Sequence, residues 1–212
     1  MISDSTAIIE LHYLPTIAYL TAWVYFDRMI IESKENYTKQ TYRNRTRILT
    51  ANNQENLIVP VEKGNRNIPI QEIRIDYKQD WVNKHWRSIQ SAYGNAPFFE
   101  YYHEKLKNIL FKKPRFLFDL NITILEYMFD ILKLEKEISF SEKFIKKYPN
   151  GIVDLRSLIH PKKTLDAVVF YKPVEYIQVF GKHFDENLCA MDLVFNEGPN
   201  ALNKIKISLK AT

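Results

Sequence analysis

Cysteine and glycine are the residues that this sequence has least of. Cys189 is the only cysteine among 212 residues, so neither an internal disulfide nor a zinc site built from several cysteines can form. Only five glycines occur, and the P-loop, Gly-x-Gly-x-x-Gly and Gly-x-Ser-x-Gly patterns are all missing. Disulfide scaffolds are therefore excluded, and the sequence lacks the usual signatures of phosphate-binding loops, dinucleotide folds and serine hydrolases.

An excess of one charge and long apolar runs are also absent. Thirty Lys and Arg against 25 Asp and Glu give a net charge of +5, which is low for a nucleic-acid-binding protein. The apolar stretches 17–26 and 122–134 are too short or too interrupted to span a bilayer. No basic segment followed by an unbroken apolar run begins the chain. We therefore expect a cytoplasmic protein without a membrane span, and nucleic acid is not the favoured partner.

The first thirty residues have the pattern that opens an α/β domain. The apolar run 6–11 predicts a buried strand, and residues 28–32 predict a second one. Pro15 stands where a helix can begin, and apolar residues at helical spacing follow it over 17–23. Strand, helix and strand in this order are typical of the opening of an α/β domain.

Residues 46–50 and 56–61 are β-like, and the amide-rich stretch 51–55 between them suits a hairpin loop. The spaced isoleucines of 68–75 predict one further strand. Most predicted strands therefore lie in the first third of the chain.

The middle of the chain has the clearest helical periodicity. Three helices are predicted over roughly 80–134, beginning near Asp80, Pro97 and Pro114, with Gly94 ending the first. The C-terminal third, about 138–212, is predicted to be irregular within a single domain 1–212. The predicted class is α/β, with a mixed sheet, a β-hairpin insertion and a three-helix group. Segregated α+β is the alternative, because the strands precede the helices.

A basic segment is the strongest local signal. Lys39, Arg43, Arg45 and Arg47 fall within nine residues. If 42–47 forms a strand, the three arginines share one face and would bind a phosphate or carboxylate with their planar guanidinium groups. The alternative is a solvated face whose arginines form salt bridges with Glu32, Glu35 or Glu62.

Two histidines are candidate general bases. His12 lies in a turn between the first strand and first helix, where α/β proteins place ligands, but it could instead hydrogen-bond to the scaffold. His85 lies on the helix that begins near Asp80, on the same side as Trp81, and could instead be a polar group at the core edge. No His-x-His or His-x-x-x-His spacing supports a metal site, and no pattern identifies a cofactor.

Several short stretches follow recognisable motifs. They are Tyr13-Leu14-Pro15; the spacing of Tyr37, Lys39, Asn44 and Arg45; Val59-Pro60-Val61; Trp81 with His85; and Asp192-Leu193-Val194-Phe195-Asn196. In this order they resemble the motifs of the WbqC-like protein family over nearly the whole chain. Two features depart from the pattern: the leading Gln-Pro is replaced around residues 10–12, and a Tyr-Leu-Ser-Gly segment gives way to the proline-containing stretch 149–161.

The resemblance implies a role in surface-polysaccharide synthesis, such as O-antigen synthesis, in which an amino-acyl group such as glycine is transferred onto a sugar. The implied partner is a small molecule, a nucleotide-sugar or sugar phosphate. The predicted catalytic residues are His12 and His85. The predicted substrate-binding residues are Tyr13, Tyr37, Lys39, Arg43, Asn44, Arg45, Trp81, Asp192 and Asn196. A non-catalytic module that binds a phosphorylated sugar or an acidic partner is the alternative.

Overall fold

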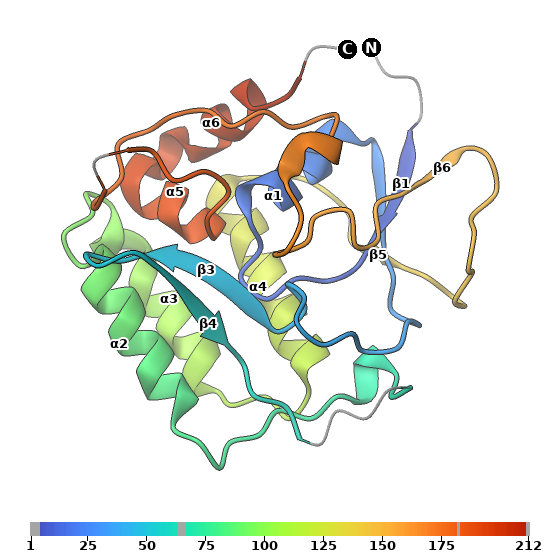
Figure 1. The fold of residues 1–212 in the computed structure, drawn as a ribbon, viewed down its shortest axis with the longest axis horizontal. Helices are drawn as coiled ribbons and strands as arrows, with labels where there is room; N and C mark the ends of the chain where they lie inside the picture. Colours follow the sequence, from blue (N-terminus) through green and yellow to red (C-terminus); the bar gives the residue numbers. More distant parts are fainter. Residues whose placement is uncertain (1–4, 63–66, 182, 211–212) are drawn as a thin grey trace.

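A four-stranded parallel sheet organises the fold. The computed structural model describes residues 5–62, 67–181 and 183–210 (Figure 1). The strands are β1 (Thr6–Ile9), β2 (Arg28–Ile31), β5 (Ser139–Phe140) and β6 (Ile152–Asp154), arranged in the order β5-β2-β1-β6. Each neighbouring pair is parallel. β1 is apolar because it lies inside the sheet, where parallel strands are covered on both faces.

The predicted strand–helix–strand opening is confirmed. Helix α1 (Ile17–Tyr25) connects β1 to β2. It begins two residues after Pro15, and the Thr16 hydroxyl accepts a hydrogen bond from the Tyr19 N–H at 3.4 Å as the N-cap. A crossover of this kind is required to bring two consecutive strands into parallel register.

The predicted hairpin forms a second sheet. Strands β3 (Arg45–Leu49) and β4 (Gln54–Ile58) pair antiparallel around a short loop, in which the Thr50 N–H donates to the Asn53 carbonyl at 3.0 Å. The α/β class is confirmed, with parallel pairing in the central sheet and antiparallel pairing in the hairpin.

The strand predicted over 68–75 is wrong. Residues Ile70–Glu72 form the 3₁₀-helix η1; Ile70, Ile73 and Ile75 are buried in the core, and Ile68 is partly buried against it. Ile70 and Ile73 are three residues apart, the spacing at which side chains of a 3₁₀-helix align. The spacing of Ile70 and Ile73 therefore reflects burial of one face of a helical turn, and not the alternation of a strand.

The predicted three-helix group is confirmed by α2 (Trp81–Tyr93), α3 (Phe99–Phe111) and α4 (Leu117–Leu132). Figure 1 shows α2 and α3 beside the hairpin, with α4 passing behind. Asp80 takes the N-cap position of α2, but its carboxylate accepts from the Asn83 side chain at 2.6 Å and caps no backbone N–H.

The C-terminal third is more regular than predicted. Among the described residues of 141–189, β6 and the 3₁₀-helix η2 (Leu165–Ala167) are the only regular elements, but α5 (Ala190–Glu197), the 3₁₀-helix η3 (Gly198–Asn200) and α6 (Ala201–Ile207) follow. These helices are too short to show a clear period in the sequence, and helices of this length depend on tertiary packing.

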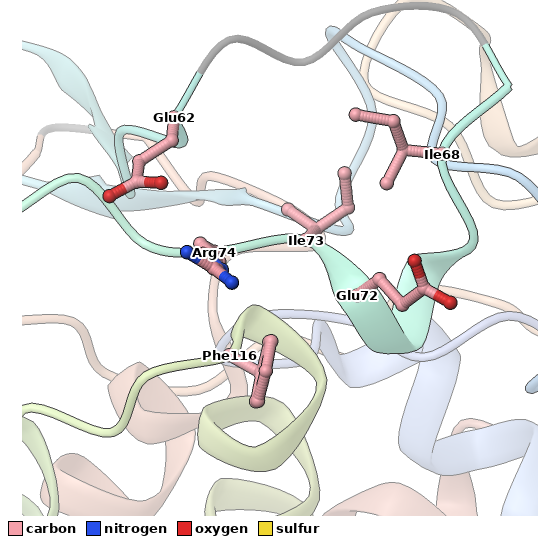
Figure 2. A pocket seen from close by; sticks show the side chains of 6 residues that line it. All are labelled: Glu62, Ile68, Glu72, Ile73, Arg74 and Phe116. Carbon is pink, nitrogen blue, oxygen red and sulfur yellow. The ribbon is translucent and has the colours of Figure 1, made fainter.

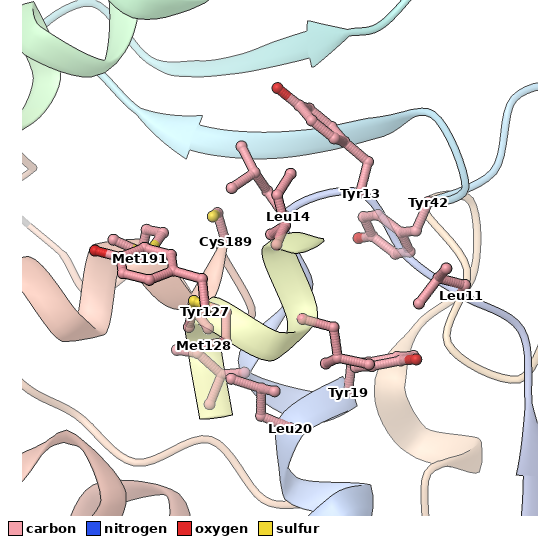
Figure 3. Close-up of a cluster of buried hydrophobic side chains, with 14 of the residues drawn as sticks. Leu11, Tyr13, Leu14, Tyr19, Leu20, Tyr42, Tyr127, Met128, Cys189 and Met191 are labelled. Atoms are coloured by element: carbon pink, nitrogen blue, oxygen red, sulfur yellow. The ribbon is translucent and has the colours of Figure 1, made fainter. Parts of the chain in front are cut away.

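One apolar core connects these elements. Figure 3 shows part of this core: Tyr13 and Leu14 come from the turn after β1, Met128 comes from α4, and Cys189 directly precedes α5. Cys189 is buried, as expected of a cysteine that serves as a small apolar side chain. In the described ranges, no helix has the length and apolar content that crossing a membrane requires.

Candidate functional site

Polar side chains follow each strand of the parallel sheet. Glu10 comes directly after β1, Glu32 after β2 and Ser141 after β5, while Arg156 lies two residues beyond β6. Because the strands are parallel, their carboxyl ends meet at one edge. From β1 the chain crosses to β2, whereas β6 is added on the other side of β1. Ligands of open α/β sheets bind where the strand order changes direction in this way, here between the ends of β1 and β6.

Arg43 is the centre of a buried ion cluster at this edge. Its Nε and Nη2 atoms donate to the two carboxylate oxygens of Glu35, each at 2.6 Å. Its Nη1 atom lies 3.4 Å from Glu10 Oε1. The guanidinium is 2% exposed, so two carboxylates neutralise a charge that water does not reach.

Glu10 connects this cluster to the chain beyond β6. Its Oε2 atom accepts the Ser157 N–H at 2.8 Å, and its Oε1 atom lies 3.5 Å from His12 Nε2. Burial alone would raise the pKa of Glu10, but His12, Arg43 and the Ser157 N–H together lower it to about 2. Glu10 is therefore ionised at neutral pH.

His12 is buried beside the Glu10 carboxylate. Burial lowers its pKa, with Glu10 opposing, so the imidazole is neutral. The ring packs against Tyr19 with centroids 4.3 Å apart, and neither nitrogen forms a hydrogen bond within the described residues. A neutral imidazole can accept a proton, but this one is enclosed by the protein.

Arg156 has the same arrangement as Arg43. Its Nη2 and Nε atoms donate to Asp154 at 2.6 and 2.9 Å, and its Nη1 atom donates to Glu32 at 3.0 Å. The Ser141 hydroxyl in turn donates to Glu32 at 2.6 Å. Each guanidinium at this edge is thus held by two carboxylates.

A pocket of about 370 Å³ opens between the two arginines. Its lining includes Lys34, Glu35, Arg43, Phe144, Arg156 and Ser157. Phe144 is 53% exposed, and the Arg156 guanidinium lies 5.0 Å from its ring centroid. Paired polar groups beside an exposed aromatic ring can hydrogen-bond hydroxyl groups and cover an apolar face of the same ligand.

The predicted row of three arginines on one strand face is wrong for Arg43, because β3 begins at Arg45. Arg45 and Arg47 do share the half-exposed face of β3, whereas Thr46 between them is buried. Arg47 donates to the Pro161 carbonyl at 2.5 Å and to Gln54 Oε1 at 3.4 Å. The pairing of Arg43 with Glu35 is the alternative that the sequence left open.

The other residues of the basic segment differ in their surroundings. Lys39 is exposed. Tyr37 is buried, and burial raises its pKa to about 12 although Arg45 and Arg43 oppose the shift. The Asn44 side chain donates to the Val59 carbonyl at 2.8 Å, so it joins the segment before β3 to the one after β4.

His85 belongs to a second buried cluster. The Tyr13 hydroxyl lies within hydrogen-bonding distance of His85 Nδ1 at 3.0 Å, and Trp81 packs edge-on against the imidazole with centroids 4.9 Å apart. Burial lowers the pKa of His85 to about 4, with the Ile58 carbonyl opposing. None of these three side chains lines the pocket between the arginines.

Asp192 forms a third cluster. Its Oδ1 atom accepts from the Tyr176 hydroxyl at 2.7 Å, and the Asn196 side chain donates to the Asp192 carbonyl at 2.8 Å. Burial raises the pKa of Asp192 to about 6, although neighbouring polar groups, with the Tyr176 hydroxyl first among them, oppose the rise. The predicted site residues thus do not form one site, and of them Arg43 alone lines the pocket.

Sequence reasoning missed Glu10, Glu32 and Arg156 as site residues. Each lies within two residues of the end of a parallel strand. An acidic residue directly after a buried apolar run could have indicated Glu10 and Glu32. Arg156 had no such signal, because β6 is a three-residue strand in an irregular region.

A second pocket of about 570 Å³ lies beside η1, lined by Glu62, Ile68, Glu72, Ile73, Arg74 and Phe116 (Figure 2). It contains none of the predicted site residues. Within the described ranges, no group of three His, Cys, Asp or Glu side chains is placed to hold a metal ion.

The fold and the pocket define an α/β protein with a pocket at the carboxyl edge of its parallel sheet. A family model described as the WbqC-like protein family matches residues 11–167, and the chain belongs to this family. The matched range includes most of the pocket residues and ends before Asp192 and Asn196.

A curated relative is the uncharacterized protein Rv1507c of Mycobacterium tuberculosis, which is 36% identical over 94 residues. The match covers 44% of this chain and 40% of the relative, so the chain spans well under half of that protein. No solved structure matches the chain.

Proposed function

We propose that this protein is a transferase of surface-polysaccharide synthesis that binds an activated sugar in the pocket between Arg43 and Arg156. The transferred group is an amino-acyl group such as glycine, or another acyl group. The pocket itself is the observation that supports the proposal, because it lies at the edge where α/β enzymes bind ligands. The resemblance to the WbqC-like family supports the polysaccharide context.

The lining suits the hydroxyl groups of a sugar. Glu35 offers carboxylate oxygens as acceptors, and Arg43 and Arg156 offer donors held in fixed positions by their carboxylate partners. The exposed ring of Phe144 can cover the apolar face of a pyranose. Both guanidiniums are already neutralised, which favours a hydroxyl-rich group, and Lys34 adds one cation to the lining that forms no ion pair within the described residues.

Glu35 is the general-base candidate that faces the pocket. Burial raises the pKa of Glu35, with Arg43 opposing, and a raised pKa makes a carboxylate a better proton acceptor. His12 and His85 remain predictions as general bases, since both are neutral and neither lines the pocket.

A non-catalytic sugar-binding module is the second candidate. It is favoured by the pairing of Glu35 with Arg43, because a carboxylate held by two 2.6 Å hydrogen bonds must leave them to accept a proton. Binding without turnover would identify such a module.

The test begins with thermal unfolding in the presence of nucleotide-sugars, sugar phosphates and acyl-coenzyme A. A ligand that binds only the folded protein stabilises it by about 2.7 kcal/mol at a hundredfold excess over Kd. The ligands that bind are then assayed for acyl transfer with wild type, Glu35→Gln and the exposed control Glu104→Gln. Loss of turnover in Glu35→Gln alone supports the transferase. Binding with no turnover supports the module, and no binding contradicts both.

A further inference from the structure

We infer that the phosphate of the activated sugar binds at a basic turn, defined here as residues 160–163 together with Arg47 of β3. The inference rests on the proposed function and extends it, because it assigns the charged half of the substrate to Arg47 and to lysines that the sequence did not single out. The turn lies beyond β6 and beside the pocket.

The turn has a fixed shape. The Lys163 N–H donates to the His160 carbonyl at 3.0 Å, and the Lys162 N–H donates to His160 Nδ1 at 3.1 Å. Arg47 donates to the Pro161 carbonyl at 2.5 Å, and the Lys162 ammonium donates to Gln40. These two hydrogen bonds hold residues 160–163 against β3 and against Gln40 before it, so the cationic groups of the turn have defined positions.

The turn is connected to the wall of the pocket through Ser157. The Lys163 ammonium donates to the Ser157 carbonyl at 2.9 Å, and Ser157 itself lines the pocket. The N–H of the same residue donates to Glu10. A ligand whose sugar lies in the pocket could therefore place its phosphate beside Lys163 without leaving the protein surface.

The cations of the turn are not paired with carboxylates, whereas the two arginines of the pocket are. Arg43 and Arg156 are each held by two carboxylates, whereas Arg47, Lys162 and Lys163 form no ion pair within the described residues. Their hydrogen bonds go to carbonyl and amide oxygens, which leave the positive charge available. A phosphate would supply the missing negative charge.

His160 lies within the positive electrostatic field of these cations. Its pKa is lowered by burial first and then by Lys163, Arg43 and Lys162, with Glu10 as the opposing charge. The cations of the turn and of the pocket edge therefore act on the same place. The sequence predicted an anion site that included Arg43 and Arg47. The inference keeps Arg47 in the anion site and replaces Arg43 with the lysines of the turn.

The test uses pyrophosphate first, measured by isothermal titration calorimetry. The variant is Lys162→Gln with Lys163→Gln, and the control is Lys84→Gln with Lys112→Gln, a pair of equally exposed lysines on α2 and after α3. We expect at least tenfold weaker binding in the variant and a reduced dependence of Kd on salt, with the control unchanged. No pyrophosphate binding to wild type, or equal binding to the variant, overturns the inference.

UDP-glucose and free glucose separate the inference from the proposed function. Weaker binding of UDP-glucose to the variant, with glucose binding unchanged, supports the inference. Equal binding of UDP-glucose to wild type and variant overturns the inference but leaves the proposed function standing. Pyrophosphate binding that depends on the lysines, with no binding of any nucleotide-sugar or sugar phosphate, supports the anion site and contradicts the proposed function.

Discussion

Glu10 and Asp192 are two carboxyl groups buried to the same extent, each 1% exposed, whose pKa values move in opposite directions. Burial raises both, but Glu10 contacts a guanidinium and accepts a backbone N–H, and its pKa falls to about 2. Asp192 is surrounded by neutral hydroxyl and amide groups, and its pKa rises to about 6. Burial by itself therefore does not decide the charge of a buried acid, because the partners do.

The same contrast separates the regions of the molecule in which Glu10 and Asp192 lie. The carboxyl edge of the sheet holds an ionic cluster that stays charged, whereas the clusters around His85 and Asp192 are held by hydrogen bonds without an ion pair within the described residues. An ionic cluster depends on every member, because removing one leaves its partner charged and unpaired in the interior. A neutral network loses one hydrogen bond at a time.

Arg43→Ala is expected to have the largest effect. It leaves Glu10 and Glu35 without their shared cation, and breaking a buried pair of this kind costs about 3–5 kcal/mol of unfolding free energy. Urea unfolding of the variant measures this loss. The control Arg87→Ala removes an exposed arginine of α2 and should change stability by less than about 0.5 kcal/mol. Equal, small losses in both variants would mean that the ionic cluster does not stabilise the fold.

Glu10 makes the protein sensitive to acid. Its pKa is lower in the folded chain than its ordinary value of 4.5, so its stabilising contribution is present above pH 4.5 and is lost as the pH falls toward about 2. At about 1.4 kcal/mol for each pKa unit, the loss is about 3 kcal/mol. Unfolding free energy measured against pH should fall steeply in wild type over this interval and less steeply in Glu10→Gln.

Asp192 has the opposite pH dependence. Its pKa rises from an ordinary 3.8 to about 6 on folding, so the folded chain holds the proton more tightly than the unfolded chain. Stability therefore falls as the pH increases from about 4 to about 6, by about 3 kcal/mol, and stays lower above that interval. Asp192→Asn should remove this decline in the same measurement. A decline that persists in Asp192→Asn would assign it to another group.

Tyr13→Phe is expected to have the smallest effect. It removes the hydroxyl that bonds His85 Nδ1 and leaves the other contacts of the His85 cluster in place. We expect a loss of about 1 kcal/mol in urea unfolding. Tyr101→Phe, at a residue that is 78% exposed, is the matched control and should leave stability unchanged. A loss as large as that of Arg43→Ala would contradict the distinction between the ionic and the neutral clusters.

The elements that sequence reasoning predicted correctly are those whose signal is local. β1, α1 and β2 each have a period of apolar residues and a start or stop signal within a few positions, and so do α2, α3 and α4. The isoleucines around η1 misled because burial, and not strand alternation, set their spacing. The short helices α5 and α6 have too few turns to show a period of their own.

The candidate site was predicted less completely than the fold. The sequence placed His12 in the turn after the first strand and Arg43 in a basic segment farther along the chain, and the structure brings both to Glu10. Their partners could not be predicted, since Glu10 and Ser157 are separated by 147 residues. The spacing of Lys39, Arg43, Arg45 and Arg47 suggested one anion site, but it does not show which of these charges a distant carboxylate neutralises.

The sequence by itself determined the α/β class, the three helices, the hairpin and the resemblance to the WbqC-like family, because periodicity and motifs are properties of neighbouring residues. Only the tertiary structure decided that four strand ends meet at one edge, that Arg43 is neutralised and Arg47 is not, and that Glu10 is charged whereas Asp192 holds its proton at mildly acid pH. Electrostatic energies depend on distance and on the exclusion of water, and both are set by chain segments that fold together from far apart in the sequence.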